Sequence, residues 1–340
     1  MHRHYVINNI NIIQLTFFYF MKQRDTYFDT IAGLLIIVMI INHIKQWSNL
    51  TELPIIKNLD ILVFTIMPWF FFKAGMYFKN DNNNNVIHKI KQRYIKPFIY
   101  FSIIGQFVFF FYMMQNGNHD IKDYIVVPVK TLLISGAISG NLPLWFLIPL
   151  SVVYLILNNS KNKENILLLF TILVYSALCF WNVKLPYYIY TILSGLIFYI
   201  VGFKMKKIQF NNYVFIASFI IYLSIYIFIP SKVDMRSNIL ISGYYVLWFI
   251  FGICGVITFN NLFKRIKFLN FVFLERIGID SMVYYVVHWI IIVLFVTILN
   301  ALNITDPYIK FTTLSLACLI LLPMSKKLLS SPKLKFLIGK

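Results

Sequence analysis

Residues 28–48 read FDTIAGLLIIVMIINHIKQWS, an apolar run whose polar side chains lie near its two ends. A helix of about 20 residues spans the roughly 30 Å hydrocarbon core of a bilayer. A helix also satisfies every backbone N–H and C=O group where no water is present. The stretch therefore predicts a transmembrane helix that carries Asp29 close to one end and His43 close to the other.

The same pattern recurs along the chain. Of its 340 residues, 59% are hydrophobic and 13% are charged, whereas soluble domains carry roughly 25% charged residues. The sequence thus predicts an all-α, polytopic integral membrane protein with about ten transmembrane helices. Besides 28–48, the apolar runs that predict these helices are 58–78, 95–114, 143–158, 165–182, 186–203, 212–230, 238–259, 280–300 and 308–324.

A further apolar stretch, Ile121–Leu142, is a candidate eleventh span. Lys130 lies in its middle, and Gly136, Ser139 and Gly140 interrupt it. Counting this stretch as a span would also invert the side of the membrane assigned to every later loop. We therefore expect a re-entrant or interfacial segment here.

The positive charges alternate between the loops. With the N-terminus inside, most of the 31 Lys and Arg residues fall in segments on one side, which is the cytoplasmic side by the positive-inside rule. Both termini are then expected in the cytoplasm, and the protein is expected in the bacterial cytoplasmic membrane. The net charge of +19 argues for topology rather than nucleic-acid binding, because the cations lie between apolar runs and not on one basic face.

The chain is expected to divide into an N-terminal segment at 1–26, one transmembrane domain at 27–325 and a basic cytoplasmic tail at 326–340. Residues 1–20 lack the cleavage site of a signal peptide, and Met21 opens a cleaner start, so we interpret 1–20 as a start-site extension. The three cysteines lie within apolar runs and lack the spacing of a zinc site or a disulfide framework. No metal site is expected.

Ionisable side chains within the spans are functional candidates, because charge is costly in lipid. His43 is the foremost, since a neutral imidazole accepts a proton from a hydroxyl near pH 7, as acyl transfer to an alcohol requires. A hydrogen bond between helices is the alternative role for His43, and it is the favoured one for His288. Lys73 would extend to the nearby interface. Asp29 and Asp280 would also suit helix N-termini.

The loop from Lys79 to Pro97 is the most basic internal loop. Its cations would suit the phosphates of a nucleotide-like acyl donor. They would equally serve to set the topology or to contact anionic membrane lipid. The basic side chains ahead of the next helix are His88, Lys89, Lys91, Arg93 and Lys96.

Four separated segments share a pattern with a known family. They are Tyr27–Gly33 with the following Asn42-His43, then Met67–Lys79 with its PWFFFKAG core, then Leu144–Leu147, and finally Gly278–His288. In this order and spacing they resemble the membrane acyltransferase-3 family, which includes fucose 4-O-acetylase-like enzymes and surface-polysaccharide O-acetyltransferases. The resemblance extends from Tyr27 to Trp289.

That resemblance implies an O-acyltransferase that moves an acetyl group from acetyl-CoA to a sugar hydroxyl of a cell-surface polysaccharide or its lipid-linked precursor. Acetyl-CoA would be a substrate reached from the cytoplasm, and no tightly bound cofactor is implied. The residues that it implies are His43 and Asp29 for catalysis, Arg93, Lys73 and Lys89 for donor binding, and Trp145, His288 and Ser281 for substrate binding.

Two positions depart from the family pattern. The basic residue that commonly precedes the first-helix glycine is Ala32 here, and the serine before the second glycine is Ala74, beside Lys73. The first departure weakens the implied donor contact, so that either Lys73 or Arg93 substitutes or the protein is inactive. Two alternatives stay open: transfer of succinyl or another acyl group to the same acceptors, and export or flipping of a polysaccharide.

Overall fold

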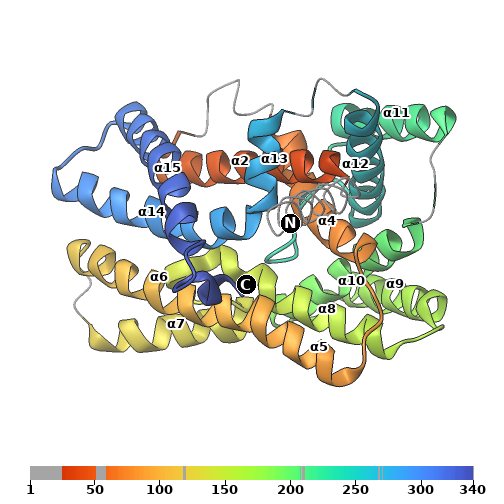
Figure 1. Ribbon diagram of the computed structural model, residues 1–340, viewed down its shortest axis with the longest axis horizontal. Coiled ribbons are helices and arrows are strands. Elements are labelled where there is room, and N and C mark those ends of the chain that lie inside the picture. Colours follow the sequence, from red (N-terminus) through yellow and green to blue (C-terminus); the bar gives the residue numbers. More distant parts are fainter. Residues whose placement is uncertain are drawn as a thin grey trace, which may run out of the picture.

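The computed structural model describes residues 25–50, 59–117, 120–206, 208, 211–266, 269 and 271–339. The apolar runs form helices (Figure 1), as the need to satisfy the backbone in lipid requires. Residues 1–20, the expected start-site extension, lie outside the described residues. The elements are α2 (Thr26–Trp47), α4 (Asp60–Met76), α5 (Asn83–Ile90), the π-helix η1 (Lys91–Ile95), α6 (Lys96–Gln115), α7 (Ile121–Ser135), the 3₁₀ helix η2 (Ser139–Phe146), α8 (Leu147–Asn159), α9 (Glu164–Phe180), α10 (Tyr187–Met205), α11 (Asn212–Phe228), β1 (Lys232–Asp234), β2 (Ile239–Ser242), α12 (Tyr245–Arg265), α13 (Val272–Ile279), α14 (Ser281–Ala301), α15 (Pro307–Leu329) and the 3₁₀ helix η4 (Lys335–Ile338).

Seven helical segments of the described chain are long and apolar enough to cross a membrane. Three further apolar helices, in α4, α9 and α11, are shorter. The fold is thus that of a multi-pass membrane protein. The expected count of about ten spans depends on the three shorter helices and stays a prediction.

Helices α2 and α4 occupy the middle of the molecule (Figure 1). On one side of them lie α6, α7, α14 and α15, and on the other lie α8 to α12. Helix α2 contacts α4, α12, α13 and α14. This central position means that side chains from several parts of the chain converge on α2.

Glycines allow two helix pairs to pack backbone against backbone. A Cβ atom on Gly33 of α2 would overlap a backbone oxygen of α13, and one on Gly278 of α13 would overlap a backbone oxygen of α2. Gly75 of α4 and Gly202 of α10 form a second reciprocal pair of the same kind. Small residues are the usual means of close helix contact in membranes. They hold α2 and α4 at defined positions relative to their neighbours.

The stretch Ile121–Leu142 is helical at first and then breaks, as its glycines predict. Helix α7 ends at Gly136, whose φ of 72° is left-handed, and η2 follows after two further residues. The break is held from inside the protein, since Gln106 Oε1 accepts hydrogen bonds from Ser139 Oγ at 3.1 Å and from Gly140 N at 3.0 Å. Asn141 Nδ2 donates to backbone oxygens of α6 and α14. Such internal partners are what an irregular backbone within a membrane protein requires.

The helix expected at 238–259 begins later than expected. The residues from 238 to 244 were expected to begin a helix, but β1 and β2 form an antiparallel hairpin and α12 begins only at Tyr245. Local hydrogen bonds explain the difference, because Asp234 accepts from the backbone N of Arg236 at 3.1 Å and from Ser237 Oγ at 2.7 Å. Asn238 has a left-handed φ of 53°. Side-chain bonds of this kind compete with helix formation.

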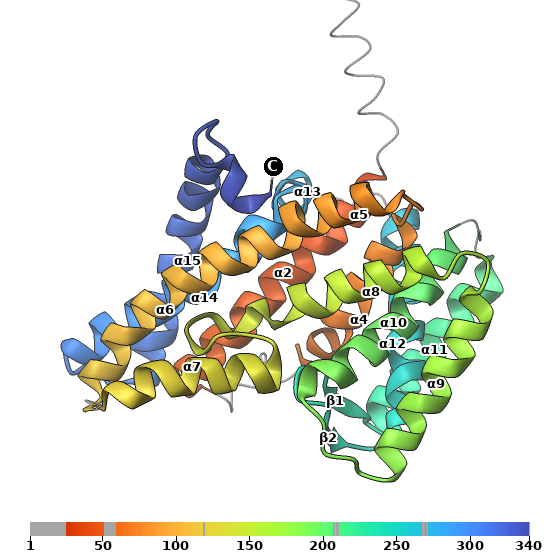
Figure 2. The same ribbon diagram turned by 90° about the horizontal axis from the view of Figure 1, so that it is seen from below.

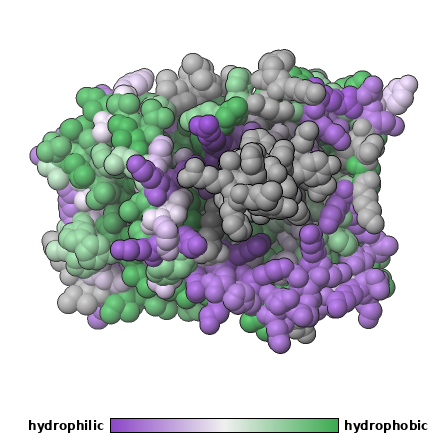
Figure 3. Space-filling view, viewed as in Figure 1, coloured by the Kyte–Doolittle hydropathy of each residue, from purple (hydrophilic) through white to green (hydrophobic). Residues whose placement is uncertain are grey.

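The molecule has two unlike ends. The start of α2, helices α5 and α13 and the C-terminal end lie at one edge, and the β1–β2 hairpin lies toward the opposite edge (Figure 2). Hydrophilic residues gather over α5 on the first of these faces (Figure 3). We call the first face the basic face and the second the hairpin face. The expectation that both termini are cytoplasmic stays a prediction.

Candidate active site

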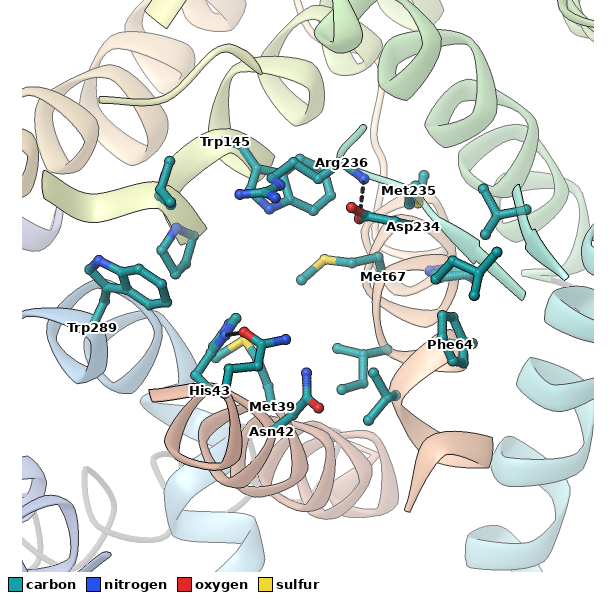
Figure 4. Close-up of a pocket in the computed structure, with 18 residues that line it drawn as sticks. Met39, Asn42, His43, Phe64, Met67, Trp145, Asp234, Met235, Arg236 and Trp289 are labelled. Carbon is teal, nitrogen blue, oxygen red and sulfur yellow. Dashed lines mark hydrogen bonds between the residues drawn. The ribbon is translucent and has the colours of Figure 1, made fainter. Parts of the chain in front are cut away.

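His43 lines a cavity of about 340 Å³ toward the hairpin face (Figure 4). We call this the outer cavity. Five parts of the chain build it: the end of α2, the first half of α4, η2, the hairpin and α14. Its lining residues are Met39, Asn42, His43, Gln46, Val63, Phe64, Ile66, Met67, Pro68, Leu142, Pro143, Trp145, Val233, Asp234, Met235, Arg236, Ile241 and Trp289.

The imidazole of His43 is oriented by its own helix. Its Nδ1 lies 3.2 Å from Oε1 of Gln46, which is nearly one turn later on α2. A carbonyl oxygen accepts, so Nδ1–H donates and Nε2 keeps a lone pair. This is the arrangement of a general base whose tautomer is set by the hydrogen bond at its other nitrogen.

His288 lies directly behind His43. The two ring centroids are 5.3 Å apart with the planes inclined by 22°, so the imidazoles stack. Nδ1 of His288 lies 2.8 Å from the backbone oxygen of Tyr285 and 3.1 Å from that of Tyr284, and therefore carries the hydrogen. His288 is completely buried and does not line the outer cavity. The structure thus places it against His43 rather than at the surface that a substrate would contact.

The ring of Trp289 fixes a second side of His43. It stands edge-on to the imidazole, with centroids 5.1 Å apart and an angle of 88°. Trp145, an expected substrate-binding residue, lies on η2 and lines the outer cavity. The neighbouring Pro143 is held in place because its backbone oxygen accepts a hydrogen bond from the Tyr285 hydroxyl. The helix break and α14 together bring an aromatic wall to His43.

Ser281, the third expected substrate-binding residue, lies elsewhere. It lines a smaller cavity of about 180 Å³, the inner cavity, whose lining also includes Tyr94, Met67 and Tyr285. Met67 lines both cavities, which are therefore neighbours along α4. Tyr94 belongs to η1 on the basic face. The inner cavity thus lies between the basic face and the outer cavity.

Asp29 pairs with Lys73 and not with His43. Nζ of Lys73 lies 3.4 Å from Oδ1 of Asp29 and donates to the backbone oxygen of Phe28 at 3.3 Å. Asp29 and His43 are about 20 Å apart along the axis of α2. A proton cannot pass directly between side chains at this separation, so Asp29 does not act with His43 as an adjacent acid–base pair. Phe28 and Asp29, which Lys73 contacts, lie about one helical turn before the buried Ala32, where the family pattern has its basic residue.

The stretch from Lys79 to Pro97 was expected as a loop, but from Asn83 on it is helical, in α5, η1 and the start of α6. Its cations line a third depression, on the basic face, which we call the basic pocket. Its volume is about 490 Å³, and η4 of the C-terminal segment closes one side of it through Phe336 and Gly339. The expected donor-binding residues Arg93 and Lys89 both line it. The remaining lining residues are His88, Gln92 and Lys96.

The two expected donor-binding residues that line the basic pocket differ in their surroundings. Lys89 forms an ion pair with Asp81, which also accepts a hydrogen bond of 2.8 Å from the Tyr154 hydroxyl. These hydrogen bonds from Lys89 and Tyr154 lower the pKa of Asp81. Arg93 is exposed on the π-helix η1, a distortion that is frequent at functional sites. Within the described residues its guanidinium has no ion-pair partner.

A family model of an acyltransferase domain, that of acyltransferase-3, matches residues 25–324. The chain belongs to the acyltransferase-3 family. No curated protein and no solved structure matches it. The match covers the whole of the outer and inner cavities, so this membrane acyltransferase has both within its acyltransferase domain. Among the described residues, no three His, Cys, Asp or Glu side chains gather in a way that could hold a metal ion.

Three polar residues of the acyltransferase's outer cavity were not expected from the sequence. Gln46 follows His43 by three residues, a spacing that places both on one helix face and could have predicted their contact. Trp289 is adjacent to His288 in the sequence. Arg236 lies between two apolar runs, and nothing in the sequence pattern indicated that its hairpin lines the same cavity as His43.

Proposed function

We propose that this acyltransferase moves an acetyl group from acetyl-CoA to a sugar hydroxyl of a cell-surface polysaccharide or of its lipid-linked precursor. The observation that carries the proposal is the position of His43. It lines a cavity at the hairpin face, with its Nδ1–H bonded to Gln46, while the cations of the basic pocket lie on the opposite, basic face. Donor and acceptor then approach from opposite sides of the protein.

The basic pocket supplies the donor site in this proposal. Guanidinium and ammonium groups form charge-assisted hydrogen bonds with phosphate oxygens, and Arg93 and Lys96 both line the pocket. The acyl-bearing arm of the donor then extends past Tyr94 into the inner cavity. From there it passes Met67 to reach His43.

The outer cavity has the composition of a carbohydrate site. Its walls are apolar and aromatic, with Trp145 and Trp289 among them. A few polar groups, such as the amides of Asn42 and Gln46, are placed among these apolar walls. Sites of this kind bury the faces of a small ligand and orient it through a small number of hydrogen bonds.

The chemical step then follows from the tautomer of His43. Nε2 removes the proton from the sugar hydroxyl as its oxygen attacks the thioester carbonyl carbon. The carbon–sulfur bond breaks, and the leaving thiolate takes the proton back from His43. The products are the sugar ester and free CoA, and His43 returns to its starting state. His288 keeps the imidazole in the orientation that this step needs, because its ring stacks on the imidazole of His43.

The test uses a strain in which the gene is deleted and restored as wild type or as His43→Ala. We expect polysaccharide acetate to return with the wild type and to stay at the deletion level with His43→Ala at equal protein abundance. Thr312→Ala is the control, because the Thr312 hydroxyl bonds only within α15, to the backbone oxygen of Tyr308 at 2.8 Å, among the described residues.

Mass spectrometry of the purified glycan gives the readout. Normal acetate content with His43→Ala would refute the catalytic assignment. A deletion strain that retains its glycan inside the cell would instead identify an exporter.

A further inference from the structure

The outer cavity contains a cation that the proposed chemical step does not use. Two of its lining residues carry a formal charge, Asp234 and Arg236, and both belong to the hairpin. The Asp234 carboxylate is occupied by the turn itself, since its oxygens accept from the backbone N of Arg236 and from Ser237 Oγ. The guanidinium of Arg236 has no ion pair with it among the described residues.

The Arg236 side chain extends over the outer cavity (Figure 4). It is half-buried and lines the same cavity as His43. An Arg presents five N–H donors in a planar fork that matches the oxygens of a carboxylate or phosphate. Within the part of the chain that the structure describes, no side-chain partner uses these donors.

The hairpin that carries Arg236 is anchored to three helices. Thr191 of α10 donates to the backbone oxygen of Met235 at 2.9 Å. Tyr175 of α9 and Tyr245 of α12 donate to the side chain and the backbone oxygen of Asn238, at 2.6 and 2.8 Å. A binding group on a support of this kind is pre-organised and loses little freedom when its ligand arrives.

A second cation of the hairpin, Lys232, has different surroundings from Arg236. Nζ of Lys232 lies over the rings of Phe64 and Tyr226, 5.5 and 5.9 Å from their centroids, and Lys232 does not line the outer cavity. The two cations are four residues apart and differ in what they face. Lys232 therefore provides a matched control for Arg236.

We propose that Arg236 binds an anionic group, a carboxylate or a phosphate, of the acceptor, which is therefore an acidic or phosphorylated sugar. This inference rests on the proposed function. The acceptor is the source of the anion because Arg236 lies on the hairpin, on the opposite side of the molecule from the basic pocket where the donor enters. The alternative source is the free carboxylate of a dicarboxylic acyl group, which would reach Arg236 from the donor side.

The test uses the purified full chain in lipid nanodiscs with labelled acetyl-CoA. The acceptor is glycan from the deletion strain in three forms: untreated, carboxyl-reduced and dephosphorylated. We expect the wild type to prefer the untreated glycan over one of the treated forms by about 10- to 100-fold. Arg236→Gln is expected to lose that preference and to match the wild type on the treated form. Arg236→Lys should retain part of the preference, and Lys232→Gln all of it.

Other results would overturn the inference. One is equal transfer by the wild type to all three glycan forms. A second is unchanged selectivity of Arg236→Gln, and a third is a loss of Arg236→Gln activity that is equal on every glycan form. A parallel series with succinyl-CoA tests the carboxylate of a dicarboxylic acyl group as the source of the anion. If the transfer rate depended on Arg236 with succinyl-CoA and not with acetyl-CoA, the acceptor assignment would also be overturned. Failure of the wild type to acetylate any glycan would instead count against the proposed function itself.

Discussion

The outer cavity and the basic pocket are built by different means. The outer cavity joins five separate parts of the chain, and its central residue is held by ring contacts with His288 and Trp289. The basic pocket consists largely of one helical stretch of the chain, from α5 through η1 to the start of α6, closed by the C-terminal segment, and its cations are partly or fully exposed. Packing therefore determines the geometry of the first site, and charge determines the chemistry of the second.

The largest effect is expected from breaking the packing behind His43. His288→Leu removes the stacked ring, and we expect kcat to fall by up to about 100-fold, because a small displacement of a catalytic group has this consequence. The KM for acetyl-CoA should not change. His288→Phe keeps a flat ring and should retain more activity. Steady-state kinetics on the purified protein measure both values, and equal activity of the two variants would contradict a positioning role.

A smaller and different effect is expected at the basic pocket. Arg93→Gln should raise the KM for acetyl-CoA about 10-fold and leave kcat unchanged, since it removes a charge-assisted bond to phosphate. Added salt should raise the KM of the wild type more than that of the variant. Lys161→Gln, an exposed change between α8 and α9 outside the pocket, is the control. A fall in kcat without a change in KM would argue against a donor site here.

Variants of the ion pair between Lys73 and Asp29 test whether Lys73 stabilises the fold or binds the acyl donor. Asp29 is 3% exposed and Lys73 18%, so Lys73→Met should lower the free energy of unfolding by about 1 to 3 kcal/mol. Combining Lys73→Met with Asp29→Asn should restore part of this loss, because a neutral amide then replaces the buried carboxylate that has lost its ion pair with Lys73. Denaturation in detergent provides the measurement. Full stability of Lys73→Met together with a raised KM for acetyl-CoA would make Lys73 a donor contact instead.

The smallest effect is expected from Asp81 in the basic loop. Its hydrogen bonds from Lys89 and Tyr154 lower its pKa, so its contribution to stability is present above the ordinary carboxyl pKa and is lost as the pH falls through the lowered value. Asp81→Asn should remove this acid dependence, so it should lower the melting temperature slightly at pH 7 and leave it unchanged at pH 3. Melting temperatures between pH 3 and pH 7 test it, and identical curves would show that the pair does not matter.

Much of the fold follows from apolar periodicity. Helix α2 was expected at 28–48 and extends over Thr26–Trp47, and the break after α7 was expected at its glycines. The hairpin was not predicted. Its turn depends on hydrogen bonds that the Asp234 side chain accepts from Arg236 and Ser237, and the residues that follow are strongly apolar, as in a helix of the membrane. The length and hydropathy of an apolar run give no information about such side-chain hydrogen bonds.

The candidate site was only partly predictable. His43 and Trp145 carry family motifs, and the structure brings both to one cavity. Arg236 and Trp289 join them through contacts between distant parts of the chain, which no local pattern encodes. Asp29 and His43 were expected near opposite ends of the first helix, and the structure has them about four turns apart. The ion pair of Asp29 with Lys73 was not expected.

The reciprocal glycine contact between α2 and α13 has a consequence for the choice of donor. The contact fixes the position of α2 along its axis relative to α13, so the distance of His43 from the basic face is constant. Along α2, Asp29 and His43 are about 20 Å apart. In the proposed reaction, a donor anchored by its phosphates must therefore carry its acyl group on a long, slender arm. A compact acyl phosphate held in the basic pocket would stop far short of the acceptor.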